Sequence, residues 1–289
     1  MQKLGHYREM GRAINPLFHR HQFRFYCSLR KPTSAGILAV MCGRFALVKS
    51  AGELIEEFEI TINTVPNSLP QDWNIAPTRE IYMIRSANGA NGARELATLS
   101  WGLIAPWSKD RSEAIRSQSQ AINARSESVH EKPTFRSAFK SRRCLIPASG
   151  YYEWATELGK YESKQPFYIH SSELNKRGEN KTLVFAGIYD RWIDPSGEMF
   201  ESAAIITRPA VDFLATIHNR MPTFLPEDRW EAWLDPKLNS VEEIRALMEL
   251  EEPARGLAAY PVSTRVNATR NNGADLITEI DVSEPNTLF

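Results

Sequence analysis

Four strand-like runs follow one another in the middle of this chain, with no helical segment between them. They are CLIPASGYYEW at 144–154, QPFYIHS at 165–171, LVFAGIYDRW at 183–192 and SAAIITR at 202–208. Neighbouring parallel strands need a crossover connection, usually a helix, and regular strand–helix alternation is the pattern of a doubly wound sheet. Because that alternation is missing, the sequence predicts an α+β fold.

Helices and a hairpin surround these runs. SAGELIEEFEI and SVEEIRALMEL each begin with Ser and carry Glu three residues later, which is capping-box spacing. The elements that the apolar period and the turn residues predict are helices at 50–60, 134–143, 209–222 and 240–250 and a hairpin at 79–104. Residues 105–133 are polar and Ser-rich, which favours a long loop. We find no repeat or linker and predict one domain over 42–281, between an N-terminal extension (1–41) and a flexible tail (282–289).

Composition restricts the function classes. The chain has 289 residues, 42% of them hydrophobic, which is enough for one sizeable core. No run of eighteen apolar residues occurs, so no membrane span is expected. Cys27, Cys42 and Cys144 are an odd number of cysteines without a CxxC pair. This argues against a disulfide framework and a zinc cluster and favours a reducing compartment. We expect no metal or other cofactor and a cytoplasmic location.

Charge is distributed unevenly along the chain. Lys plus Arg and Asp plus Glu each number 35, but residues 1–41 hold seven basic residues and one acidic residue, Glu9. The rest of the chain therefore carries six more acidic than basic residues. A DNA-binding surface on that part must be a local cluster of positive charge rather than a general field.

Residues 1–41 precede MCGRFAL, a stretch that is typical of a chain start. A basic, acid-poor segment is also the composition of an organellar targeting peptide. We favour a mis-assigned start codon over a removable pro-segment. In either case, Cys42 becomes the first residue once everything through Met41 is absent.

An N-terminal Cys42 has chemistry that an internal cysteine lacks. Its α-amine has a reference pKa of about 7.7–8.0, so part of it is unprotonated at neutral pH. The amine condenses with an aldehyde to an imine, and the neighbouring thiolate closes on that carbon to give a thiazolidine. The thiolate could instead act as an acyl-transfer nucleophile. A free cysteine can also be simply a small buried hydrophobe.

Two further residues are candidates for proton transfer. Glu153 lies among aromatic residues in SGYYEW, where desolvation would raise its pKa. Strand alternation with Glu153 facing water explains the same pattern equally well. His218 in IHNRMP stands at the end of a predicted helix, where a histidine is often only a cap for the last carbonyls.

The remaining candidates are binding residues. Guanidinium groups in loops match phosphate oxygens, although scattered arginines usually form surface ion pairs. The candidate arginines are Arg44, Arg125 and Arg220. Asn123 in INAR could donate an amide hydrogen bond to a substrate or cap a turn. Trp73, Trp101 and Trp107 could stack on unpaired bases, while core packing is the commoner use of tryptophan.

The motifs occur in an order that resembles one family, the SOS response-associated peptidase (SRAP) family of abasic-site processing proteins. The matching segments are MCGRFAL (41–47), WNIAPT (73–78), SWGLIAPW (100–107), INARSES (122–128), FRSAFKSRRCLIPASGYYEW (135–154), QPFYIH (165–170), FAGIYDRW (185–192), IHNRMP (217–222) and YPVSTRVN (260–267). Together they cover essentially everything from Cys42 to about Ile277. Family members usually begin at the Met-Cys, whereas this chain has forty further residues before Met41.

The resemblance implies a single domain with a mixed, mainly antiparallel β-barrel-like core flanked by helices. It implies an abasic-site sensor that binds single-stranded DNA and crosslinks covalently to the opened sugar of an abasic site. It implies that the protein removes the residues ahead of the cysteine itself, and it suggests lyase activity. A monomer associated with the nucleoid is expected. The implied roles are crosslinking for Cys42, holding the sugar for Asn123, proton transfer for Glu153, ring opening for His218, and DNA contacts for Arg44, Arg125, Arg220, Trp101 and Trp107.

Two other functions fit the same residues. In the first, Cys42, His218 and Asn123 form the acyl-transfer set of a Cys-dependent peptidase that acts on proteins. In the second, the chain is a non-catalytic single-stranded DNA-binding module in which Cys42 has no role. Replacement of Cys42 by Ser separates this last function from the others.

Overall fold

The computed structural model describes residues 43–87, 92–155 and 164–282, which all belong to one compact unit, Ala39–Phe289. The strands are β1 (Arg44–Leu47), β2 (Ile62–Asn63), β3 (Asp72–Ile75), β4 (Glu80–Ser86), β5 (Arg94–Trp101), β6 (Asn123–Arg125), β7 (Arg143–Ala148), β8 (Gly150–Trp154), β9 (Pro166–Ser171), β10 (Leu183–Ile193), β11 (Met199–Pro209), β12 (Arg220–Pro222) and β13 (Leu257–Pro261). The α-helices are α1 (Ala51–Glu57), α2 (Arg111–Gln120), α3 (Pro133–Ser141), α4 (Asp212–Ile217), α5 (Trp230–Leu234) and α6 (Val241–Ala246).

Five strands close into a barrel in the order β4, β5, β11, β10 and β7. The contact between β5 and β11 is parallel, with Ser100 opposite Ser202, and the other contacts in the ring are antiparallel. Closure satisfies the main-chain groups that an open sheet leaves at its edges. The predicted single-domain α+β fold with a mixed, mainly antiparallel barrel is confirmed.

A second sheet carries the start of the domain. Its strand order is β13, β9, β8, β1 and β3, and every neighbouring pair is antiparallel. Only Ser149 separates β7 of the barrel from β8 of this sheet. At Gly150 a Cβ atom would lie 2.4 Å from the Tyr168 ring and 2.7 Å from the Ile169 carbonyl oxygen. Glycine therefore lets β8 and β9 pack closely at the point where the chain changes sheets.

Aromatic side chains fill the centre of the barrel. Phe45 contacts Trp101 and Phe185 edge-on, with ring centroids 5.1 and 6.0 Å apart. All three side chains are buried, and each such burial contributes about 1.5–3 kcal/mol. Because Phe45 belongs to β1, the strand that follows the N-terminal extension is fixed directly to the barrel core.

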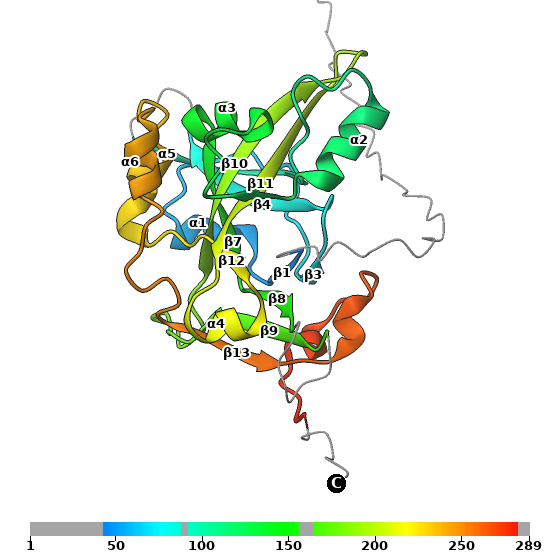
Figure 1. Cartoon of the computed structure of the whole chain (residues 1–289), viewed down its shortest axis with the longest axis vertical. Helices are drawn as coiled ribbons and strands as arrows, with labels where there is room; N and C mark the ends of the chain where they lie inside the picture. Colours follow the sequence, from blue (N-terminus) through cyan, green and yellow to red (C-terminus); the bar gives the residue numbers. More distant parts are fainter. Residues whose placement is uncertain (1–42, 88–91, 156–163, 283–289) are drawn as a thin grey trace, which may run out of the picture. The chain divides into compact units, whose positions relative to one another are not determined.

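The helices lie around this core, with α5 and α6 together on one side and α2 on another (Figure 1). In α1, Ser50 and Glu53 form the predicted capping box in both directions. Ser50 accepts the Glu53 main-chain N–H, and the Glu53 carboxylate accepts the Ser50 N–H. At α6 one direction of the box is present, in which the Ser240 side chain accepts the main-chain N–H of Glu243. The predicted helix at 134–143 is also present as α3.

Two predictions of local structure were wrong. The segment 105–133 is not a long loop, because it contains α2 and β6. Asp110 caps the start of α2. The helix buries only Ala114 and Gln118, so its sequence lacks the apolar period by which a helix is predicted. The helix predicted at 209–222 is reduced to α4, because Pro209 ends β11 and residues 220–222 form β12.

Candidate active site

Glu153 and His218 meet in the interior although 65 residues separate them in the chain. Glu153 lies on β8 and is 3% exposed, and His218 directly follows α4 as its C-cap and is 7% exposed. The Glu153 Oε2 atom lies 3.9 Å from the His218 Nδ1 atom. Glu153 therefore does not face water, as strand alternation alone would allow, because residues 150–153 of β8 are buried on both faces.

The surroundings of His218 hold its imidazole in the neutral form. Burial lowers the pKa of His218 below 6.5, and the positive charge of Arg220 acts in the same direction. The main-chain N–H of Arg220 donates to His218 Nδ1 at 3.2 Å. Because Nδ1 is the acceptor, the neutral ring carries its proton on Nε2. His218 is thus a buried neutral imidazole next to a buried carboxylate, with Nδ1 bonded to the Arg220 N–H.

Arg220 is held on several sides. Its guanidinium donates to both carboxylate oxygens of Glu127, with the Nη2–Oε2 distance at 3.0 Å. The same Nη2 atom donates to the main-chain oxygen of Thr207 at 2.7 Å. This pairing lowers the pKa of Glu127 to about 2, chiefly through the hydrogen bond from Arg220. The Arg220 side chain is therefore engaged within the protein rather than presented to solvent.

Asn123 and Arg125 lie on β6, which joins the barrel through parallel pairing with β11. The residue between them, Ala124, is fully buried, so Asn123 and Arg125 share the opposite face of the strand. Asn123 is half-buried and Arg125 is exposed. Of the three predicted DNA-contacting arginines, Arg125 is thus the one whose exposure fits phosphate binding directly.

Trp101 and Trp107 occupy opposite environments. Trp101 is 0% exposed, and its indole N–H donates to the Ile122 carbonyl oxygen at 3.0 Å. The expectation that Trp101 stacks on a DNA base is therefore wrong, because its ring belongs to the barrel core. Its hydrogen bond supports the chain at the residue before Asn123. Trp107 is 53% exposed between β5 and α2, and its surface is open to a base.

Arg44 begins β1 and is half-buried. Its Nη1 atom donates to Asn74 Oδ1 at 2.7 Å and to the Val266 carbonyl oxygen at 2.8 Å. Its guanidinium also lies 5.9 Å from the Trp154 ring centroid. Burial lowers the pKa of Arg44. The partner Asn74, which is fully buried, belongs to the WNIAPT segment, and no role was assigned to it from the sequence.

Asn74 joins the N-terminal strands to the end of the domain. Its amide donates to the main-chain oxygens of Val266, Ala268 and Asn271 at 2.9–3.2 Å. A buried asparagine with this many partners fixes the 266–271 segment against β1 and β3. The only sequence signal for this role is that Asn74 lies in WNIAPT, one of the segments that carry the family resemblance.

The reactive residue expected from the sequence, Cys42, lies outside the described residues, as does Cys27. The strand that follows Cys42 begins at Arg44, which pairs with Tyr152, the residue before Glu153. Within the described part of the chain the free cysteine is Cys144. Full burial raises the pKa of the Cys144 thiol strongly, so this side chain stays protonated and unreactive.

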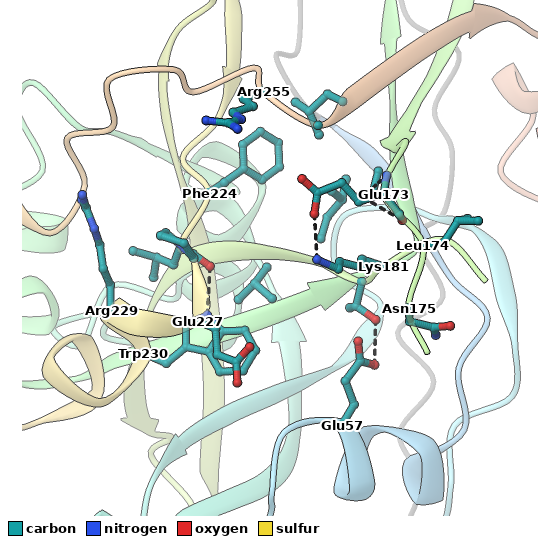
Figure 2. Close-up of a pocket in the computed structure, with 18 of the residues that line it drawn as sticks. Glu57, Glu173, Leu174, Asn175, Lys181, Phe224, Glu227, Arg229, Trp230 and Arg255 are labelled. Carbon is teal, nitrogen blue, oxygen red and sulfur yellow. Dashed lines mark hydrogen bonds and ion pairs between the residues drawn. The ribbon is translucent and has the colours of Figure 1, made fainter. Parts of the chain in front are cut away.

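A cavity of about 1170 Å³ lies elsewhere in the domain. Figure 2 shows Phe224 and Trp230 in its wall, and Lys181 paired with Glu173 at 2.7 Å. None of the candidate residues in the described ranges lines this cavity. Within those ranges, no group of three or more His, Cys, Asp or Glu side chains is arranged to hold a metal ion, and no helix is long and apolar enough to span a membrane.

Comparison with solved structures gives the same fold. The chain superposes on a crystal structure of a protein from Bacteroides thetaiotaomicron with a TM-score of 0.69 and 25% identity, over 83% of this chain and all of that one. A crystal structure of a protein from Bordetella bronchiseptica gives a TM-score of 0.61 and 27% identity, over 77% of this chain and all of that one.

Sequence relatives carry names that describe their activity. The abasic site processing protein YoaM of Bacillus subtilis is 35% identical over 82% of this chain and 97% of its own length. The abasic site processing protein HMCES of Rattus norvegicus is 31% identical over 75% of this chain and 65% of its own length. Residues 41–269 match the model of the SOS response associated peptidase family. The chain therefore belongs to the SRAP family.

Proposed function

We propose that this protein is an abasic-site sensor, which binds single-stranded DNA and captures the ring-opened abasic sugar covalently through Cys42 as its N-terminal residue. The observation that carries the proposal is the buried pair of Glu153 and neutral His218, 3.9 Å apart, beside the strand that follows Cys42. The names of the sequence relatives supply the substrate.

The proposed reaction begins with removal of residues 1–41. Hydrolysis of the Met41–Cys42 peptide bond consumes one water and leaves Cys42 with a free α-amine. We assign this cleavage to the protein itself, with Cys42 as the nucleophile that the cysteine-dependent peptidase chemistry requires. Initiation of translation at Met41 followed by removal of that methionine reaches the same state.

Capture of the aldehyde follows in two steps. The α-amine adds to the aldehyde carbon, and loss of water gives an imine. The thiol then adds to the imine carbon, which closes a five-membered thiazolidine ring and returns the proton to nitrogen. The overall reaction joins protein and DNA with the loss of one water. If the imine instead loses a proton from the sugar, β-elimination cleaves the strand, which is the lyase activity expected from the resemblance.

The described residues supply the proton transfers. In our proposal the Glu153 carboxyl group donates a proton to the hydroxyl that leaves as water. It regains a proton from the iminium nitrogen, which leaves the neutral imine. When the ring opens, neutral His218 takes the proton of the anomeric hydroxyl at Nδ1, which gives up its hydrogen bond from the Arg220 N–H. Its Nε2 proton passes to the ring oxygen as the bond from that oxygen to the aldehyde carbon breaks, so the imidazole ends neutral. Asn123, on the neighbouring β6, holds the sugar by a hydrogen bond. No metal or other cofactor takes part in these steps.

DNA binding is assigned to two exposed residues. Arg125 meets phosphate, and Trp107 offers a ring for base stacking. Arg44 and Arg220 flank the site but are engaged within the protein, so their contact with DNA requires a change of partner. We propose that the protein acts as a monomer on DNA in the cytoplasm, associated with the nucleoid.

The proposal is tested with an oligonucleotide that carries one abasic site, followed by denaturing electrophoresis. Wild-type protein should give a slowly migrating covalent product, and Cys42→Ser should give none while still binding the oligonucleotide without denaturant. An oligonucleotide with a tetrahydrofuran analogue, which has no aldehyde, serves as the matched control. Covalent product with the analogue, or with Cys42→Ser, refutes aldehyde capture by Cys42. Cleavage of unrelated peptides without any DNA product would favour the peptidase alternative.

A further inference from the structure

The ion pair between Arg220 and Glu127 joins two segments of the candidate active site, the one that carries Asn123 and the one that carries His218. Glu127 lies two residues beyond β6, which carries Asn123 and Arg125, and Arg220 begins β12, two residues after His218. The guanidinium donates to both oxygens of the carboxylate. From the sequence, Arg220 was expected to contact DNA, and Glu127 had no expected role.

Burial is unequal across this pair. The Arg220 side chain is 9% exposed and the Glu127 side chain is 49% exposed. Arg220 also donates to the main-chain oxygen of Thr207 at 2.7 Å and to its hydroxyl at 3.3 Å. A buried guanidinium needs its donors satisfied and its charge balanced, and Glu127 is the carboxylate that pairs with Arg220. Without Glu127, the charge of Arg220 would therefore be buried without a counter-charge. Without Arg220, the carboxylate of Glu127 would still be in contact with water.

The loop that carries Glu127 is itself anchored. The main-chain N–H of Ser126 donates to the Thr207 carbonyl oxygen at 2.8 Å, and that of Val129 donates to the Arg125 carbonyl oxygen at 2.8 Å. The carboxylate thus approaches Arg220 from a fixed backbone. Thr207 accepts from both Ser126 and Arg220, so β11 serves as the common base for the two segments.

Arg220 contacts His218 through its main-chain N–H. The N–H of Arg220 is the donor to His218 Nδ1, and this contact sets which imidazole nitrogen carries the proton. The same residue thus provides the N–H for His218 and the guanidinium that Glu127 holds, so fixing its side chain limits the freedom of this N–H. A carboxylate that holds the guanidinium by two hydrogen bonds resists a shift of Arg220.

We propose that Glu127 is a positioning residue, which keeps Arg220 in place and thereby orients the His218 imidazole, and which keeps the Arg220 guanidinium from DNA phosphates in the DNA-free protein. This inference rests on the proposed function, since it describes how the capture site is held. It assigns Arg220 to the support of the site and leaves Arg125 as the arginine that meets phosphate first.

The test compares Glu127→Gln with Glu131→Gln. Glu131 is an exposed residue four positions along the same loop, so the control removes an equal charge without touching Arg220. For each protein the rate of covalent capture is measured against the concentration of abasic oligonucleotide. Glu127→Gln should lower the maximal rate about tenfold, while the oligonucleotide concentration for half-maximal rate stays the same or falls, because one repelling charge is gone. Glu131→Gln should keep the wild-type maximal rate.

A second readout does not depend on DNA. In Glu127→Gln the charge of Arg220 loses its counter-charge, so the midpoint of the His218 titration, followed by NMR, should move to lower pH than in wild type. The groups that face His218 in this comparison are Glu153 on β8 and Arg220 on β12. A merely structural defect would broaden or remove the signal rather than move its midpoint. Glu131→Gln should leave the midpoint unchanged.

The outcomes separate this inference from the proposed function. If wild type forms no covalent product, the proposed function fails, and the His218 titration still tests the positioning role. If wild type captures DNA and Glu127→Gln matches it in both maximal rate and His218 midpoint, the positioning role alone is refuted. Should Glu127→Gln fail to fold, Glu127→Asp keeps the charge but shortens the side chain. The same reasoning then predicts a smaller loss of rate with an unshifted midpoint, and a wild-type rate refutes it.

Discussion

Trp101 and Trp107 provide a matched pair for testing the assignment of core and DNA-binding residues. Trp101 is fully buried with its indole N–H bonded to the Ile122 carbonyl oxygen, whereas Trp107 is 53% exposed. Replacement by Phe keeps an aromatic ring at each position but removes the indole N–H. The two substitutions therefore change the same atoms in opposite environments.

The magnitude at Trp101 follows from two losses. A buried carbonyl oxygen without its donor costs about 1–3 kcal/mol. The smaller ring leaves a cavity that costs roughly another 1 kcal/mol. Trp101→Phe should thus lower the free energy of unfolding by roughly 2–4 kcal/mol, and each kcal/mol corresponds to a fall in Tm of about 2–4 °C for a chain of this size. Trp107→Phe should change it by less than about 0.5 kcal/mol.

Urea unfolding measures stability, and noncovalent binding of single-stranded DNA to Cys42→Ser protein measures recognition. At a temperature where both variants are folded, Trp101→Phe should bind DNA like the parent. Trp107→Ala should lose about 1–3 kcal/mol of binding free energy, the usual contribution of one stacked base. A Trp101→Phe variant with parental stability and weakened DNA binding would refute the assignment of Trp101 to the core.

Three further results are expected. Arg143→Met should lower the free energy of unfolding by about 3–5 kcal/mol in urea, because the Arg143 guanidinium donates to five main-chain carbonyl oxygens in the interior; a loss below 1 kcal/mol contradicts this. Gly150→Ala should cost about 1–3 kcal/mol and slow covalent capture, since the new Cβ meets the Tyr168 ring and displaces the strand that carries Glu153; an unchanged rate and Tm would show that β8 is not tightly fixed. The NMR titration of His218 should have its midpoint below pH 6.5, because burial lowers its pKa. The unfolded chain then binds more protons than the folded one, so the free energy of unfolding should fall as the pH drops below about 6.5. A midpoint above 6.5 contradicts the burial of this imidazole.

The sequence predicted elements that depend on local signals. The capping box at Ser50 and Glu53 formed in both directions, and the turn-rich segment between β4 and β5 produced the expected antiparallel hairpin. Both signals lie within a few residues of the structure that they specify. The barrel closure between β5 and β11 has no such local signal, since it pairs Ser100 with Ser202. It was anticipated only through the family resemblance.

The candidate site was predictable in its residue types but not in their burial. The sequence pattern did not distinguish Trp101 from Trp107. Both tryptophans lie in the segment SWGLIAPW, and only the fold places Trp101 in the core and Trp107 at the surface. Strand alternation alone allowed Glu153 to face water, but β8 is buried on both faces, and Glu153 with it. The ion pair between Arg220 and Glu127 joins residues that are 93 positions apart, and a single sequence does not reveal such a contact.

The intact mass of protein expressed from the full reading frame and incubated with an abasic single-stranded oligonucleotide tests the central claim most directly. We expect one covalent species with the mass of residues 42–289 plus the oligonucleotide minus one water. That mass would show that Cys42 has become the terminal residue and has captured the aldehyde. A protein that retains residues 1–41 and carries no DNA would contradict covalent capture by this chain.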